Sequence, residues 1–119
     1  MEVLEMKYAE LGNYIGGKTQ AATTERFLEV LSPTDGSLLS RVPMSTASDL
    51  DAAVKAAQAA LEGWSKMPIK ERAQVFFRYK TLLERDMAEL SHLVHEENGK
   101  TLEEARAEIE KSIELTEFA

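Results

Sequence analysis

The chain has 119 residues, a formal net charge of −7 and no cysteine. A chain of this length can build one hydrophobic core, and its acidic balance argues against unaided binding to nucleic acid or to an anionic membrane, because both need basic surfaces. The lack of cysteine excludes a disulfide, a thiolate zinc site and a thiol nucleophile within these residues.

The amino-terminal stretch, residues 1–11, is acidic and has neither a basic start nor an apolar run. It therefore matches neither a secretory signal nor an arginine-rich transit peptide. No stretch of the chain is apolar over the length that a bilayer requires. The sequence predicts a reducing, cytoplasmic setting.

Short extended segments are expected before residue 46. Asn13–Ile15 leads into Gly16-Gly17, a pair that tolerates positive φ angles and suits a hairpin turn. A second strand is expected over Arg26–Leu31, closed by the turn residues Ser32–Gly36, and a third over Leu38–Val42, up to the following proline. Such short strands need a larger body on which to pack.

The first helix is expected to start at Ser48, because Ser48 and Asp51 have the spacing of a capping box. Gly63 is expected to end it. Alanine is frequent along this helix, so neighbouring elements can approach it closely on more than one side. Its apolar stripe, at spacings of four and three, consists of Leu50, Val54, Ala57, Leu61 and Trp64.

A second helix is expected to have Pro68 in its first turn, where a missing amide hydrogen is tolerated. Lys80 takes one expected apolar position. Asp86 and Glu89 form a second start signal, which predicts a kink or a new helix near Arg85-Asp86. The apolar stripe across both parts consists of Ile69, Ala73, Phe76, Leu83, Met87, Leu90 and Val94.

Asn98-Gly99 is typical of a helix carboxyl terminus with its glycine in the left-handed conformation. Thr101 and Glu104 then form a capping box for a last helix. This helix reaches Ala119 with no glycine, proline or cationic last turn, so we expect it to continue and the chain to be the front part of a longer protein. Its stripe consists of Leu102, Ala105, Ile109, Ile113 and Thr116.

These elements predict an α+β chain, with extended strands and a hairpin followed by about four amphipathic helices. The strand arms are expected over residues 1–45 and the helical part over residues 46–119, with no complete catalytic domain in either.

Two glycine-containing segments could suggest phosphate binding. Gly99-Lys100-Thr101 matches the end of a P-loop, but the loop needs a glycine five residues before Gly99, and that position is Val94. The end of one helix before the next explains the segment better. Gly16-Gly17-Lys18 lacks the G-x-G-x-x-G spacing that opens a helix, which favours a hairpin turn.

A metal site is the other candidate chemistry. His92 and His95 are three residues apart with Glu96 beside them, but zinc-binding helices use the H-E-x-x-H spacing, so surface histidines are expected. No serine lies in a G-x-S-x-G turn. The sequence therefore predicts no catalytic, no cofactor-binding and no metal-binding residue. The aromatic residues Trp64, Phe76, Phe77 and Tyr79 are expected in the core.

Six segments in this order resemble the amino-terminal region of NAD(P)-dependent aldehyde dehydrogenases, over about residues 12 to 119. The segments V-P-M-S-T-A-S-D-L-D-A-A-V-K-A-A, G-K-T-L-E-E-A-R-A-E-I and E-L-T-E-F-A are most similar to the coenzyme A-acylating methylmalonate-semialdehyde dehydrogenase branch. The six are Asn13–Gly17, Ser32–Gly36, Arg41–Pro43, Asp51–Ala57, Trp64 with Arg72, and Glu97–Thr101 with Glu104-Ala105.

The resemblance implies a larger α/β enzyme of Rossmann type, with NAD as cofactor and a homo-oligomeric assembly, that oxidises a semialdehyde to an acyl-CoA. In this family the nucleotide-binding strands, the nucleophilic cysteine, the general-base glutamate and the oxyanion asparagine all follow the segment that these residues resemble. No catalytic residue is carried over, and the chain is expected to be inactive alone. Two departures from the family pattern, Ser32 and Ala107-Glu108, involve no reactive group.

Two other readings remain open at this point. The chain could be a stand-alone helical module that presents an apolar stripe to a protein partner, or a small enzyme that uses a metal or a nucleotide. The sequence does not distinguish NAD from NADP, identify the aldehyde or the acyl acceptor, give the number of subunits, or say how a truncation would have arisen.

Overall fold

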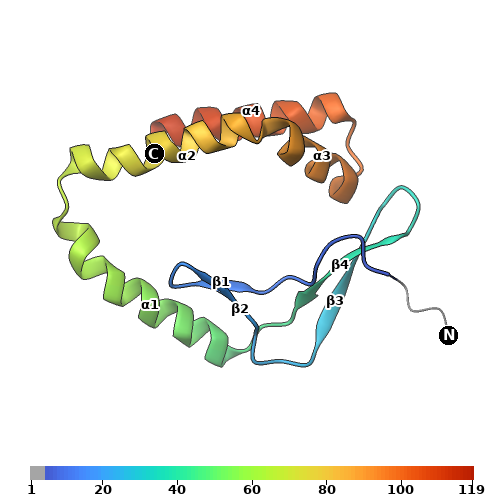
Figure 1. Cartoon of the computed structure of the whole chain (residues 1–119), viewed down its shortest axis with the longest axis horizontal. Helices are drawn as coiled ribbons and strands as arrows, with labels where there is room; N and C mark the ends of the chain where they lie inside the picture. Colours follow the sequence, from blue (N-terminus) through green and yellow to red (C-terminus); the bar gives the residue numbers. More distant parts are fainter. Residues whose placement is uncertain (1–4) are drawn as a thin grey trace. The chain divides into compact units, whose positions relative to one another are not determined.

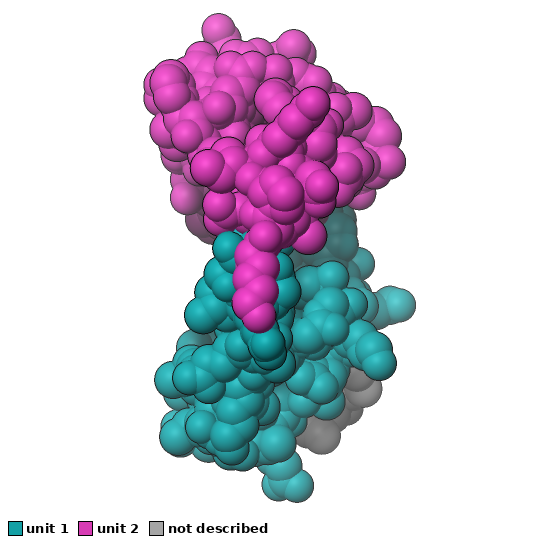
Figure 2. Space-filling model, turned by 90° about the vertical axis from the view of Figure 1, so that its left-hand side faces the viewer, with its two compact units in different colours: residues 1–31, 36–65 teal, residues 32–35, 66–119 magenta. Residues whose placement is uncertain are grey.

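The computed structural model describes residues 5–119, so the start of the acidic amino terminus lies outside the described residues. Within these residues four strands precede four helices, and Figure 1 labels them along the chain. The residues form two compact units, which are coloured separately in Figure 2. Among the described residues, one unit holds residues 5–31 together with Gly36–Ser65, and the other holds Ser32–Asp35 with Lys66–Ala119. The predicted succession of strands and about four helices is confirmed.

The first hairpin joins β1 (Asn13–Ile15) to β2 (Lys18–Gln20) in antiparallel pairing. Gly16 and Gly17 form its turn with φ angles of 62° and 79°. Positive φ at both central residues gives the turn the twist that matches antiparallel strands. The predicted hairpin turn at this glycine pair is confirmed.

The second hairpin joins β3 (Phe27–Leu31) to β4 (Leu38–Pro43). The chain before β1 lies along the other edge of β4, where the amides of Lys7, Tyr8 and Leu11 donate to carbonyls of β4. Ser40 also donates its hydroxyl to the Ala9 carbonyl at 2.7 Å. Within this unit Leu39 is the buried apolar side chain among the described residues.

Helix α1 (Ala47–Lys66) begins and ends at other residues than the sequence predicts. Thr46, and not Ser48, is hydrogen-bonded across the first turn, to Asp49, while Asp51 forms an exposed ion pair with Lys55. The predicted cap at Ser48 and Asp51 is wrong, because a threonine and an aspartate with the same spacing occur two residues earlier and Asp49 gains further donors from outside the helix.

The predicted end of α1 at Gly63 is also wrong. The helix passes through Gly63 and ends at Lys66, two residues before Pro68. An interior glycine lowers helix stability by about 0.5–1 kcal/mol but does not stop the helix, whereas a proline disfavours helical geometry in the residue before it. Pro68 therefore determines where α1 ends.

Helices α2 (Ile69–Arg85), α3 (Met87–Asn98) and α4 (Leu102–Phe118) pack together in the second unit. Asp86 separates α2 from α3, as predicted, whereas Pro68 lies at the N-cap just before α2 and not within its first turn. Lys80, which interrupts the predicted stripe, forms ion pairs with Glu117 of α4 and with Glu84. The buried apolar residues of this unit, among those described, are Ala105 and Ile113, both on the predicted stripe of α4.

Much of the remaining apolar stripe surface is exposed. On α1, Leu50 and Leu61 are 66% and 58% exposed, and on α2 Ile69 is 76% exposed. A folded soluble domain normally covers such stripes with its own elements. No helix over the described residues is long and apolar enough to cross a membrane.

Candidate functional site

The segment Gly99-Lys100-Thr101 connects two helices. Gly99 ends α3 with a φ of 79°, and the Thr101 hydroxyl accepts from the Glu104 amide at 3.2 Å. The Glu104 carboxylate accepts in return from the Thr101 amide at 3.0 Å, which lowers its pKa. Lys100 forms an ion pair with Glu108. The predicted helix end and capping box are confirmed, and these side chains are engaged in holding the turn.

The two histidines lie on α3 with ring centroids 6.1 Å apart. His95 is hydrogen-bonded through Nδ1 to the Lys100 carbonyl, and so it helps to close the same turn. Within residues 5–119 no group of three or more histidine, aspartate, glutamate or cysteine side chains is placed to hold a metal ion.

Pro33 packs against the turn between α3 and α4. A Cβ atom on Gly99 would lie only 3.0 Å from the Pro33 Cγ atom. Ser32 is buried beside it, and its hydroxyl accepts from the Thr34 amide at 3.3 Å. Pro33 and Gly99 belong to two of the segments on which the family resemblance rests, Ser32–Gly36 and Glu97–Thr101, and these two residues meet within the second unit.

Asp49 accepts more hydrogen bonds than any other carboxylate among the described residues, and the sequence patterns did not single it out. It is 6% exposed. One oxygen accepts from the Thr23 amide and hydroxyl at 2.9 and 3.0 Å, and the other accepts from the Thr46 amide and hydroxyl at 2.7 and 3.0 Å. The local signal was present as T-x-x-D, but Thr23 lies 26 residues away.

These donors lower the pKa of Asp49 below its ordinary value of 3.8, chiefly through the amide of Thr46 and then that of Thr23. Because each carboxylate oxygen already accepts two hydrogen bonds, the group is held ionised and is unsuited to proton transfer near neutral pH. Asp49 instead ties the segment after β2 to the start of α1.

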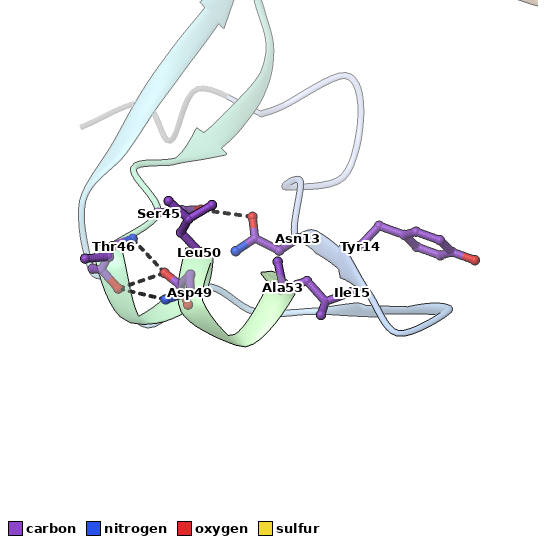
Figure 3. Close-up of a pocket in the computed structure, with 9 residues that line it drawn as sticks. Asn13, Tyr14, Ile15, Ser45, Thr46, Asp49, Leu50 and Ala53 are labelled. Carbon is purple, nitrogen blue, oxygen red and sulfur yellow. Dashed lines mark hydrogen bonds between the residues drawn. The ribbon is translucent and has the colours of Figure 1, made fainter. Parts of the chain in front are cut away.

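A pocket of about 410 Å³ adjoins this cluster, between β1 and the first turns of α1 (Figure 3). Its apolar lining comes mainly from Ile15, Leu50 and Ala53. At its polar side the Asn13 amide oxygen accepts from the Ser45 hydroxyl at 2.9 Å. Figure 3 shows the Tyr14 ring pointing away from the Asp49 cluster. The pocket offers apolar contact, and the side chains of Ser45, Thr46 and Asp49 in its lining already have hydrogen-bond partners.

A second hollow, of about 440 Å³, lies where the α2–α3 junction meets the start of α4. The Ser91 hydroxyl at its wall donates to the Met87 carbonyl at 2.6 Å. Its charged lining residues include Glu84, Arg85 and Arg106, and Arg106 forms an ion pair with Glu110. The Ser91 hydroxyl therefore binds the backbone of its own helix, and no histidine or carboxylate within residues 5–119 accepts a hydrogen bond from it, as a base that activates a nucleophile would.

Comparison with known proteins finds malonate-semialdehyde dehydrogenases among the relatives of this chain. Malonate-semialdehyde dehydrogenase 1 of Geobacillus kaustophilus is 42% identical over all 119 residues, and the malonate-semialdehyde dehydrogenase of Lacticaseibacillus casei is 44% identical over the same length. The chain covers 24% of each of these proteins.

A crystal structure described as a methylmalonate-semialdehyde dehydrogenase from Sinorhizobium meliloti, complexed with NAD, has the same fold over this region. The TM-score is 0.89 and the identity 35%, over 95% of this chain and 23% of that one. The predicted likeness to the semialdehyde dehydrogenase branch is confirmed. The sequence pattern of the aldehyde dehydrogenase family matches residues 19–119, and the chain belongs to this family.

Proposed function

We propose that these residues form the amino-terminal scaffold of an NAD-dependent enzyme that oxidises malonate semialdehyde or methylmalonate semialdehyde to an acyl-CoA. The observation that carries this proposal is identity of 42–44% across the whole chain with two malonate-semialdehyde dehydrogenases. The S. meliloti structure, described as complexed with NAD, supports the choice of cofactor.

The scaffold role is supported by what these side chains do. The carboxylates and hydroxyls with the most hydrogen bonds, such as Asp49 and Thr101, hold turns and helix starts. The chain has no cysteine to attack an aldehyde, so a thiol nucleophile has to come from outside these 119 residues. The exposed stripes of α1 and α2 suit packing against that remaining part.

The described residues do not fit NAD by themselves. Dinucleotides bind at the carboxyl ends of parallel strands, where a glycine-rich turn leads into a helix. Here the strands form two separate antiparallel hairpins. We therefore assign no reaction step to these residues and propose that NAD binds the remainder of the enzyme. The homo-oligomeric assembly and the cytoplasmic location expected from the sequence stay predictions.

The test uses a fusion in which these 119 residues replace the matching residues of the G. kaustophilus enzyme. With NAD and coenzyme A, the fusion should produce NADH from malonate semialdehyde or methylmalonate semialdehyde, and the 119-residue chain alone should not. A parent enzyme that retains activity next to an inactive but folded fusion would argue against the proposal. A fusion active only on unrelated aldehydes would contradict the proposed substrate class.

The alternative of a stand-alone interaction module is less favoured, because the family pattern covers residues 19–119 and the relatives match the chain along its whole length. It predicts a monomer with sharp thermal unfolding and a fixed near-ultraviolet signal from Trp64. Size-exclusion chromatography and circular dichroism of the 119-residue chain separate the two readings.

A further inference from the structure

The outer edge of β3 carries main-chain groups that no strand of the described chain satisfies. The only strand beside β3 within residues 5–119 is β4. The far edge of β4 is occupied by the amino-terminal segment, through the Tyr8 amide to the Leu39 carbonyl at 2.8 Å and the Leu11 amide to the Arg41 carbonyl at 3.0 Å. The second hairpin is therefore closed on one side and open on the other (Figure 1).

The register identifies which amides face the open side. Arg26 lies opposite Met44, one position beyond the Phe27–Pro43 pair, and the Met44 amide donates to the Arg26 carbonyl at 2.9 Å. Hydrogen-bonded pairs alternate in an antiparallel ladder. The pairs Leu28–Val42 and Val30–Ser40 are thus bonded within the hairpin.

Phe27 and Glu29 occupy the intervening positions, so their amides and carbonyls point to the open edge. Two further observations agree with this assignment. Pro43, opposite Phe27, has no amide to donate, and the Arg41 carbonyl, opposite Glu29, accepts from Leu11 on the other edge of β4.

The side chains on this strand indicate the chemistry of an occupant. Leu28 and Leu31 are 60% and 49% exposed, so apolar contact is available. Glu29 lies directly opposite Arg41, but the Arg41 guanidinium pairs with Glu10 and lies 4.9 Å from the Phe27 ring centre. Glu29 has no ion pair within residues 5–119, and a cation opposite it on the outer side would supply one.

We propose that β3 receives an extended strand from the part of the enzyme outside these 119 residues, with a lysine or arginine opposite Glu29. This inference rests on the proposed function only in assuming a longer polypeptide, which is supported by the 24% coverage of the relatives. Strand addition to an open edge is a common mode of recognition. A second copy of this chain suits the edge poorly, because pairing centred on Glu29 would set two carboxylates opposite each other.

Amide hydrogen exchange at single-residue resolution tests the pairing. In the 119-residue chain the Phe27 and Glu29 amides should exchange much faster than those of Leu28 and Val30. In the fusion all four should exchange at similarly slow rates. If the two outer amides remain as fast in the fusion as in the free chain, the edge is open to water, Glu29 only deters aggregation, and the inference is overturned whether or not the fusion is active.

Protected outer amides in a fusion without dehydrogenase activity would support the strand pairing and contradict the proposed activity. Protection that develops in the free chain as its concentration is raised would instead assign the edge to a second copy.

Charge reversal tests the cationic partner separately. Glu29→Lys should restore fast exchange at Phe27 in the fusion, and Glu29→Gln should have a smaller effect. Glu25→Lys, an exposed control outside the strand, should leave the exchange unchanged. Equal exchange rates in Glu29→Lys and the unaltered fusion would rule out the opposing cation.

Discussion

At the scale of single residues, the Asp49 side chain joins segments that are distant in the sequence, and the absence of a side chain at Gly99 lets another segment pack closely. The Asp49 carboxylate joins Thr23 to Thr46 through four hydrogen bonds. Gly99 ends α3 with positive φ and lets Pro33 approach closely. Each residue acts within one compact unit, and each can be tested by a substitution with a matched control.

We predict that Asp49→Asn destabilises the fusion at neutral pH and that the difference shrinks in acid. The pKa of Asp49 is lowered in the folded chain, so the folded state binds this proton more weakly than the unfolded state. The stabilisation of the folded state by the ionised Asp49 carboxylate is complete above the ordinary pKa of 3.8. It is lost as the pH falls from 3.8 through the lower pKa of Asp49 in the folded chain. Urea unfolding of both proteins from pH 7 to pH 3 measures the difference; a gap that widens in acid would contradict the assignment.

Gly99→Ala should destabilise the second unit by more than Gly36→Ala destabilises its own hairpin. Both glycines have positive φ, 79° and 74°, so both substitutions cost about 1–2 kcal/mol for a left-handed alanine. Only at Gly99 would the added methyl meet a neighbour, Pro33, whereas Gly36 has open space. Thermal unfolding of the single variants and of Gly99→Ala with Pro33→Ala measures the contact. The double variant should recover the excess loss, and additive effects would exclude the Pro33 contact.

At the scale of elements, helix boundaries that depend on neighbouring residues lie where the sequence predicts them. Boundaries that depend on residues far away in the chain do not. The Asp86 interruption, the Gly99 helix end and the Thr101 capping box lie where local patterns predict them. The cap of α1 lies at Thr46, two residues before the predicted cap at Ser48, and the Asp49 side chain that binds Thr46 also binds Thr23 from another segment. Local pattern alone did not distinguish the two possible caps.

Gly63→Ala should stabilise α1, by about 0.5–1 kcal/mol. The reason is that Gly63 lies inside the helix, and beyond the neighbouring backbone of the helix itself an added Cβ would meet nothing within 4 Å. A glycine that ended the helix in a left-handed conformation would give the opposite result. The free energy of unfolding of the fusion and its far-ultraviolet ellipticity provide the measurement, and a loss of stability would show that α1 stops at Gly63 in solution.

At the scale of the whole molecule, several apolar stripe residues of the helices are exposed. The stripe residues Leu50, Val54 and Leu61 on α1 are exposed, as are Ile69 and Phe77 on α2. Each unit therefore has an apolar face without a covering element among residues 5–119. This distribution agrees with a segment that covers 24% of its relatives' length.

The isolated chain should bind a hydrophobic dye and self-associate, while the fusion should bind far less dye per molecule. The exposed stripes would be covered in the fusion by the remainder of the enzyme. Dye fluorescence and light scattering at several concentrations measure both properties. As a control, Leu50→Glu with Leu61→Glu should reduce dye binding by the isolated chain; an isolated chain that stays monomeric and dye-free would support a self-sufficient module.

The sequence by itself determined the order of strands and helices, the glycine turns, the cap at Thr101 and the family, because these depend on neighbouring residues or on an ordered set of short segments. The tertiary structure alone decided the cap at Thr46, the packing of Pro33 on Gly99 and the open edge of β3. Each of these depends on groups far apart in the chain, such as Thr23 with Asp49 or Leu11 with Arg41. Which of these distant groups pair depends on how the chain folds and on which of several similar partners lies within reach. A pattern of neighbouring residues does not predict this.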